Sequence, residues 1–227
     1  MGSVKDYIRT KSSKSFVKAV RNARQEWRYA RLHRSELKKV KQFLRLPDKK
    51  LNLGCGHHPK PGWINVDLLE SDADLRLDLR EEWPFAENSI NYIYSEHIFE
   101  HFELDEEVPH FLSEALRVLR PGGTFDVGVP DTEWALRSYG DPSDPYWLFS
   151  KTVHPDGCET QLDHINYHFR QGTEHKYAWD YETLARTLQK FGFIEITRRE
   201  FDARLDADHR KLGTLYVRAL KPNTATQ

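Results

Sequence analysis

The stretch Leu51-Asn-Leu-Gly-Cys-Gly-His-His-Pro-Lys-Pro-Gly-Trp-Ile-Asn-Val-Asp67 decides the fold of this chain. A short apolar strand at Leu51 and Leu53 ends in Gly54-Cys55-Gly56, and a second apolar segment ends in Asp67. The glycines let the backbone turn tightly and leave room for a ligand, while a carboxylate can accept hydrogen bonds from a ribose diol. Two parallel strands that end side by side in this way indicate a nucleoside site at the carboxyl edge of a sheet.

Charge is divided unevenly along the 227 residues. Residues 1–50 contain 16 Lys and Arg against four Asp and Glu, although the formal net charge of the whole chain is only −1. The sequence therefore predicts a basic helical extension over residues 1–47 and one α/β domain over residues 48–221. Two cysteines, no apolar run of membrane-spanning length and no secretory signal lead us to expect a cytoplasmic protein, with peripheral membrane contact left open.

The extension carries apolar residues at helical spacing after a polar arm at residues 1–14, which we expect to be flexible. The apolar positions are Phe16, Val20, Ala23, Trp27 and Ala30, and then Leu37, Val40 and Leu44. We expect this stripe to dock on the domain or on a second copy in a homodimer. Contact of residues 15–45 with an anionic membrane or a partner protein, and a nucleic-acid arm, are the alternatives.

The domain alternates strand and helix signals. Strands are expected near residues 73–77, 90–94, 124–129, 193–199 and 213–220, and helices near 106–119 and 181–191. Residues 140–178 show little periodicity, and we interpret them as an irregular insert on the substrate side.

Several motifs in this order resemble the class I S-adenosylmethionine-dependent methyltransferases, in a compact bacterial branch often placed with glycan and secondary-metabolite pathways. They are Leu-Asn-Leu-Gly-Cys-Gly, Gly62-Trp-Ile-Asn-Val-Asp67, Trp83-Pro-Phe85, Glu96-His97 with Glu100-His101, Leu116 to Gly123, and His175-Lys-Tyr177 with Gly192-Phe193. The resemblance covers about residues 49–220. It implies a Rossmann-like, mostly parallel sheet of seven strands in the order 3-2-1-4-5-7-6, with the last strand antiparallel.

The resemblance also implies S-adenosylmethionine as the cofactor. Gly54 and Gly56 would pass its methionine part, Asp67 would bind the ribose, and Asp78 with Leu79 would meet the adenine. The implied cofactor-binding residues are Asn52, Leu53, Gly54, Cys55, Gly56, Asp67, Leu68, Asp78, Leu79, Ser95 and His97. Two departures stand out: Asn52 replaces the usual acid, and the segment between Gly56 and Asp67 is too short for the usual helix. The N-terminal helix is a candidate to fill that place.

A hydroxyl acceptor needs a base because its pKa lies far above 7, and histidine is the default residue for that task. The predicted catalytic residues are His97, His164 and His175. The predicted substrate-binding residues are Asp131, His154, His168 and Tyr177. Methyl transfer needs no metal and we predict none. His164 and His168 would share one face of a helix, with Cys158 and Asp163 nearby, which is a spacing that could ligate one.

The sequence thus predicts a methyltransferase that acts on a small-molecule or glycan-linked acceptor, at oxygen, with a histidine base. A nucleic-acid methyltransferase anchored by the basic arm is the first alternative. We rank it lower because the domain is acidic and no Asn/Asp-Pro-Pro-Tyr motif follows the fourth strand. A catalytically inactive partner protein that still binds the cofactor is the second alternative.

Overall fold

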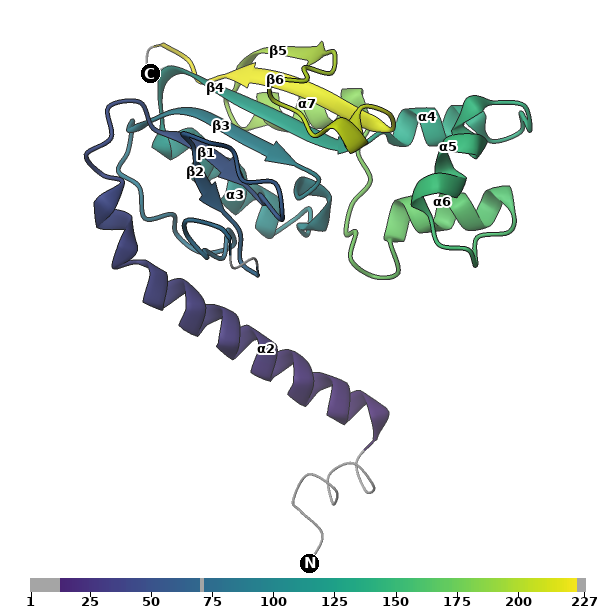
Figure 1. Ribbon diagram of the computed structural model, residues 1–227, viewed down its shortest axis with the longest axis horizontal. Coiled ribbons are helices and arrows are strands. Elements are labelled where there is room, and N and C mark those ends of the chain that lie inside the picture. The colour runs from purple at the N-terminus through teal and green to yellow at the C-terminus, as the bar shows by residue number, and fades with distance from the viewer. Residues whose placement is uncertain (1–12, 70–71, 224–227) are drawn as a thin grey trace, which may run out of the picture.

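A six-stranded sheet in the order β2-β1-β3-β4-β6-β5 forms the centre of the computed structural model, which describes residues 13–69 and 72–223 (Figure 1). The strands are β1 (Lys50–Leu53), β2 (Ile64–Val66), β3 (Ile90–Glu96), β4 (Leu119–Pro130), β5 (Ile194–Arg199) and β6 (Thr214–Leu220). The first four strands pair in parallel, and β6 runs antiparallel to both β4 and β5. The expected Rossmann-like order and the antiparallel last strand are confirmed.

The prediction of a strand at residues 73–77 is wrong in extent. Within the described residues it is reduced to one parallel bridge between Val66 and Leu75, so the sheet has six strands and not seven. Asp74 accepts hydrogen bonds from the Asn65 backbone and side chain, and Arg76 turns away to pair with Glu36 of the N-terminal helix. These side-chain bonds take the place of further ladder bonds.

Two helices cover the face of the sheet that lies at the back in Figure 1. They are α3 (Glu107–Val118) and α7 (Tyr181–Lys190), and they bury Phe111, Leu112, Leu184 and Leu188 against the strands. The buried residues of α3 and α7 form one continuous apolar cluster with residues of the strands. Burial of such side chains stabilises the fold by about 1.5–3 kcal/mol each.

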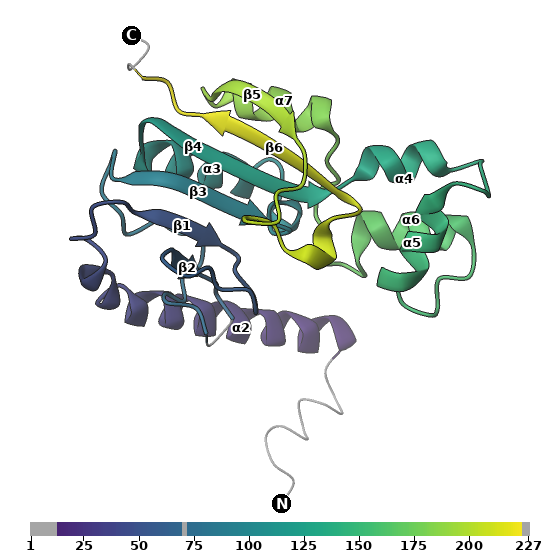
Figure 2. The same cartoon turned by 45° about the horizontal axis from the view of Figure 1, so that its top comes forward.

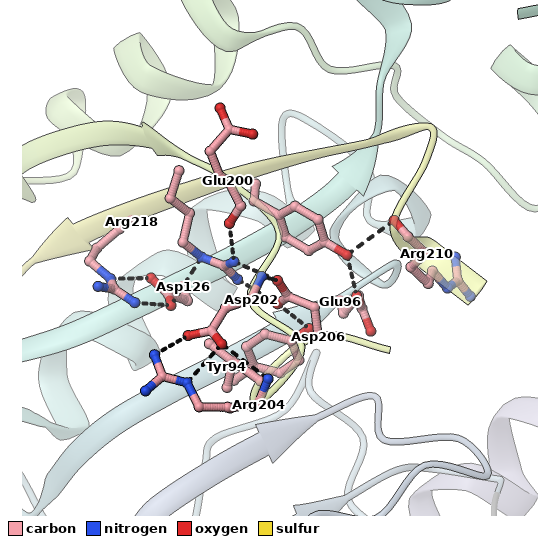
Figure 3. Close-up of polar contacts among 12 residues, drawn as sticks. Tyr94, Glu96, Asp126, Glu200, Asp202, Arg204, Asp206, Arg210 and Arg218 are labelled. Carbon is pink, nitrogen blue, oxygen red and sulfur yellow. Dashed lines mark hydrogen bonds and ion pairs between the residues drawn. The ribbon is translucent and has the colours of Figure 1, made fainter. Parts of the chain in front are cut away.

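The opposite face carries a network of charged and phenolic side chains (Figure 3). Asp126 of β4 is fully buried and accepts bonds from Arg218 of β6 at 2.7 and 2.8 Å. Arg199 of β5 binds Asp206 at 2.6 and 2.7 Å, and Tyr94 of β3 donates to the same carboxylate. The network thereby fixes the β5–β6 loop (residues 200–213) over the sheet.

Three short helices follow β4 beyond the ends toward which the arrows of β3 and β4 point in Figure 1. They are α4 (Thr132–Ser138), α5 (Pro145–Val153) and α6 (Gln161–Arg170). The expectation that residues 140–178 are irregular is therefore wrong, because α5 and α6 lie within them. Local capping explains the helices: Asp144 accepts from the Tyr146 N–H with Pro145 at the first position, and Thr160 forms a capping box with Asp163.

The N-terminal helix α2 (Lys14–Glu36) runs along the β2 side of the sheet, and a short 3₁₀ turn η1 (Lys39–Gln42) follows it (Figure 2). The side chains of α2 that become buried are His33 and Glu36, whereas Phe16 and Trp27 are 52% and 66% exposed. Of the expected apolar stripe, Val40 docks in the main core at 3% exposure and Val20 and Ala30 are half-buried, whereas the other members are exposed. The predicted arm at residues 1–14 lies outside the described residues except for its last two positions. Within the described part of the chain, no helix combines the length and apolar character needed to cross a membrane.

Candidate functional site

A cavity of about 770 Å³, here called the edge cavity, opens where β1, β2 and β3 end. Its walls include predicted residues from each of these strand ends: Asn52, Gly54, Cys55, Gly56, Asp67, Leu68, Asp78 and His97. Gln25 and Tyr29 of α2 also line it, and the described chain between β1 and β2 forms no helix. The N-terminal helix therefore supplies part of the wall, as the short connection after Gly56 suggested.

Backbone geometry at the two glycines keeps the edge cavity open. Gly54 has a φ of +65°, and a Cβ atom there would lie 2.5 Å from Ile98 Cδ1. Gly56 has a φ of +48°, and nothing lies within 4 Å of its would-be Cβ. A side chain is therefore excluded by contact and strain at Gly54 and only disfavoured by strain at Gly56. Asp67 Oδ2 accepts from the Gly56 N–H at 3.0 Å, which holds the carboxylate beside the glycine turn.

Two of the predicted residues on this wall are already engaged. Asp78 is buried and accepts three hydrogen bonds from Arg80, which hold the pKa of its carboxyl below the usual range despite burial. Asn52 donates to His58 O and Asn65 Oδ1. Leu53, Leu79 and Ser95 are buried and do not line the edge cavity.

A second cavity of about 360 Å³, here called the histidine cavity, lies next to the first. Five separated segments line it: the end of β3, the end of β4, helix α5, helix α6 with the residues after it, and the β5–β6 loop with the first residue of β6. Its polar lining residues are His97, His154, His168, Gln171, His175, His209, Arg210 and Thr214. His97 and Arg210 line both cavities, so the two cavities meet at these side chains.

His97 follows β3 in a backbone conformation that non-glycine residues seldom adopt, with a φ of +53°. Its N–H donates to Gly128 O at 2.8 Å, its Nε2 lies 2.9 Å from Thr214 Oγ1, and its Nδ1 lies 3.5 Å from Glu100 Oε1. Burial lowers the pKa of His97 well below its ordinary value. The ring is therefore held neutral, and its bond to Thr214 positions it between the two cavities.

Burial dominates the electrostatics of the neighbouring groups as well. It raises the pKa of Glu100 to about 8, and it lowers the pKa of His154 to about 4 and that of His168 to about 3. The pKa of His175 is also lowered by burial, opposed by the bond of its ring to His168 O. The imidazoles of the histidine cavity are thus neutral near pH 7 and can accept protons or bind hydroxyl groups.

Some predicted residues are not brought to either cavity. His164 is buried in α6 with its Nδ1 2.9 Å from His154 Nδ1, and it lines neither cavity. Asp131 caps α4 by accepting from the Trp134 N–H, and Tyr177 packs on Trp179 at the main core. Of the predicted catalytic and substrate-binding residues, His97, His154, His168 and His175 come together.

Sequence reasoning missed three residues at this site. Arg210 comes from the β5–β6 loop, Thr214 begins β6, and Lys60 lines the edge cavity with its Nζ 4.3 Å from the Tyr94 ring centroid. Lys60 stood within the quoted stretch and could have been found there. Arg210 and Thr214 lie more than a hundred residues after His97 in the sequence, and no local pattern marks them.

Residues 51–127 match a family model described as a methyltransferase domain. The comparison with curated proteins finds no match. Similar solved structures include a SAM-dependent methyltransferase from Archaeoglobus fulgidus, with 15% identity, coverage of 86% of this chain and 94% of that one, and a TM-score of 0.47.

Another is a SAM-dependent methyltransferase, possible histamine N-methyltransferase, from Thermotoga maritima, with 18% identity, coverage of 88% and 95%, and a TM-score of 0.46. A third is a complex between the Haloferax volcanii Trm112 methyltransferase activator and the putative methyltransferase, with 19% identity, coverage of 87% and 95%, and a TM-score of 0.45.

Proposed function

We propose that the chain belongs to the class I S-adenosylmethionine-dependent methyltransferases and is an enzyme of that family. The proposed reaction is transfer of the methyl group to an oxygen atom of a small-molecule or glycan-linked acceptor. The single observation that carries the proposal is that the edge cavity and the histidine cavity share His97 and Arg210. A donor in one and an acceptor in the other would meet at these side chains.

The residues of the edge cavity fit S-adenosylmethionine. Open space surrounds the position that a Cβ of Gly56 would take, and the Asp67 carboxylate lies beside the glycine turn, where its oxygens are the acceptors that a ribose diol needs. Tyr29 of α2 and Phe102 add aromatic wall. When bound, the cofactor supplies an already activated methyl group, so the main task of the protein is to hold the acceptor in line with it.

His97 is the proposed general base. The His97 ring is unprotonated near pH 7 because burial lowers its pKa. Thr214 Oγ1 lies 2.9 Å from its Nε2, so a hydroxyl group fits at hydrogen-bond distance from that nitrogen. An acceptor hydroxyl in that place could give its proton to Nε2 as the methyl group arrives. Glu100 lies on the other side of the ring, 3.5 Å from Nδ1.

The acceptor class is proposed from the walls of the histidine cavity. Phe149 and Tyr167 offer ring faces, the imidazoles offer bonds to hydroxyl groups, and Arg210 is the cation that lines it. A volume of about 360 Å³ lies at the small end of ligand pockets, suited to one sugar or one aromatic ring. We therefore propose a polyhydroxylated or phenolic acceptor, free or at the end of a glycan.

The exposed face of α2 supports a peripheral role for the extension. Trp27 is 66% exposed on a helix that carries Arg24, Arg28 and Arg31 beside it. Such a face suits an anionic membrane surface. Cosedimentation with vesicles that contain anionic lipid, but not with neutral vesicles, would support this contact, and equal sedimentation with both or neither would contradict it.

The proposed reaction is tested by incubating the protein with S-adenosylmethionine and separate pools of phenols, sugars, amines and RNA, and measuring S-adenosylhomocysteine. Formation that depends on a phenol or sugar pool, with an O-methyl product by mass spectrometry, is expected. Formation with RNA at low salt that falls steeply as salt rises would favour the nucleic-acid alternative. Cofactor binding without turnover on any pool would favour the inactive partner.

A further inference from the structure

The carboxylate of Glu100 is buried without a hydrogen-bond partner. The residue is 1% exposed, and neither carboxylate oxygen has a partner among the described residues. Buried polar groups in native proteins are nearly always bonded, because an unpaired one costs the full desolvation penalty. Its backbone, in contrast, is well engaged, since Glu100 O accepts from the N–H groups of Lys176 and Tyr177.

Three histidines place a ring nitrogen near this carboxylate, and His97, whose Nδ1 lies 3.5 Å from Glu100 Oε1, is bonded at its Nε2 to Thr214. The Nε2 atoms of His101 and His175 lie 4.0 and 3.9 Å from Glu100 Oε1, too far for hydrogen bonds. The other nitrogen of each ring is bonded: His101 Nδ1 to Glu174 O at 3.1 Å and His175 Nδ1 to His168 O at 2.9 Å. A carbonyl oxygen only accepts, so each Nδ1 is the donor, and in the neutral ring each Nε2 presents a lone pair.

We propose that Glu100, His101 and His175 bind a divalent transition-metal cation of the zinc class. A carboxylate and two imidazoles are ligands that such ions accept, and bonds of about 2.0–2.2 Å place two ligands of one ion up to roughly 4 Å apart. The three ligand atoms lie within 4.8 Å of one another. Backbone acceptors on the far nitrogens fix ring orientation and tautomer, as the outer partners of metal-bound histidines do.

A second cluster in the molecule provides the contrast. His154, Cys158 and His164 also offer ligand atoms within 4.8 Å of one another. There, however, the two Nδ1 atoms bond to each other at 2.9 Å, and the Cys158 thiol donates to Asp163 O. Their hydrogen-bonding capacity is used without an ion, so this cluster serves as the internal control.

The proposed ion would join two parts of the cavity walls. His101 lines the edge cavity and belongs to the turn η2 (Phe99–His101), whereas His175 lines the histidine cavity. An ion between them would fix the segment after α6 to the end of β3. The proposed metal site is separate from the proposed methyl transfer. Metal binding is measured without cofactor or acceptor, so either proposal can fail without the other.

The test uses the full-length protein, stripped with chelator and titrated with Co²⁺ and Zn²⁺ by absorption spectroscopy and calorimetry. We expect a single saturating site whose Co²⁺ spectrum lacks the near-ultraviolet thiolate band, because the proposed ligands include no cysteine. Glu100→Gln and His175→Asn should each weaken binding at least tenfold. His164→Asn and Cys158→Ser should leave it unchanged, and circular dichroism would check that all variants fold.

Three results would overturn the proposal. They are no saturable binding to the wild-type protein, a thiolate band that disappears in Cys158→Ser, and unchanged affinity in folded Glu100→Gln. The spectrum of the wild-type protein decides between the two clusters even if the Glu100 variants do not fold.

Discussion

The turns that directly follow β1 and β2 supply the glycines and the acid of the edge cavity, whereas the histidine cavity is walled by side chains from five separated segments. In the first, Gly54, Gly56 and Asp67 lie within a stretch of seventeen residues. In the second, His97 meets Thr214 across more than a hundred residues of chain. The glycine turn and the acid of the edge cavity are therefore determined by residues close together in the sequence. The histidine cavity depends on packing between distant segments.

His97 belongs to both cavities, and His97→Asn should give the largest effect. We expect kcat to fall by about 10²–10⁴-fold, the usual contribution of a general base, because asparagine keeps the left-handed backbone but accepts a proton far less readily. The measurement is methyl transfer to the acceptor that the pools identify, beside S-adenosylmethionine binding.

His110→Asn, at a half-buried ring on α3 that lines neither cavity, is the matched control for that experiment. Binding of the cofactor should stay within a few-fold of the wild-type value in both variants. Equal kcat in His97→Asn and His110→Asn would remove the base from the mechanism.

The polar network that fixes the β5–β6 loop should matter more for the histidine cavity than for the edge cavity. Asp206→Ala removes the buried carboxylate from Arg199, which keeps Asp126 at 3.3 Å and Glu200 O at 3.0 Å, and breaking such a pair costs about 3–5 kcal/mol in free energy of unfolding. Urea unfolding measures this. At a temperature where the variant remains folded, the KM for the acceptor should rise while cofactor affinity holds.

Asp202→Ala is the control, because its pair with Arg204 is exposed and worth about 0–1 kcal/mol. A loss in Asp202→Ala as large as that in Asp206→Ala would contradict the assignment of the network as the support of the loop.

A smaller effect is expected where α2 meets the edge cavity. His33 Nδ1 accepts from the Asp78 N–H, and burial lowers the pKa of His33, with Arg34 acting the same way and Glu81 and Asp78 opposing. The docked state therefore binds fewer protons than the undocked state. Docking is strongest above pH 6.5 and weakens as pH falls below that value.

Trypsin cleavage or amide exchange in α2 between pH 7.5 and 5.5 measures this effect. His33→Gln retains an acceptor but cannot titrate, so its exchange should change much less over the same range. An equal acid response in both proteins would contradict the role of His33.

The fold could be predicted well because its signals are local. Gly54, Asp67 and the apolar runs at Ile90–Tyr94 and Thr124–Val129 each mark a strand end or a strand, and the structure has the predicted order. The lost third strand could not be predicted, since it depends on Asp74 bonding Asn65 and on Arg76 reaching Glu36. The Arg76–Glu36 pair exists only once α2 is in place.

The candidate site divides in the same way. His97 was found because it follows a strand end, and His164 was grouped with it only because both are histidines. The structure turns His164 toward His154 and brings Arg210 and Thr214 in its place. The helices α5 and α6 were missed because their periodicity is weak and their capping residues, Asp144 and Thr160, determine them.

The most direct test of the central claim is calorimetric titration of the wild-type protein and Asp67→Ala with S-adenosylmethionine and S-adenosylhomocysteine. We predict saturable binding of both ligands to the wild-type protein and at least a tenfold loss, about 1.4 kcal/mol, in Asp67→Ala. Asp156→Ala, an exposed carboxylate that lines neither cavity, should bind as the wild-type protein does. No binding to the wild-type protein, or equal binding to Asp67→Ala, would contradict the edge cavity as the cofactor site.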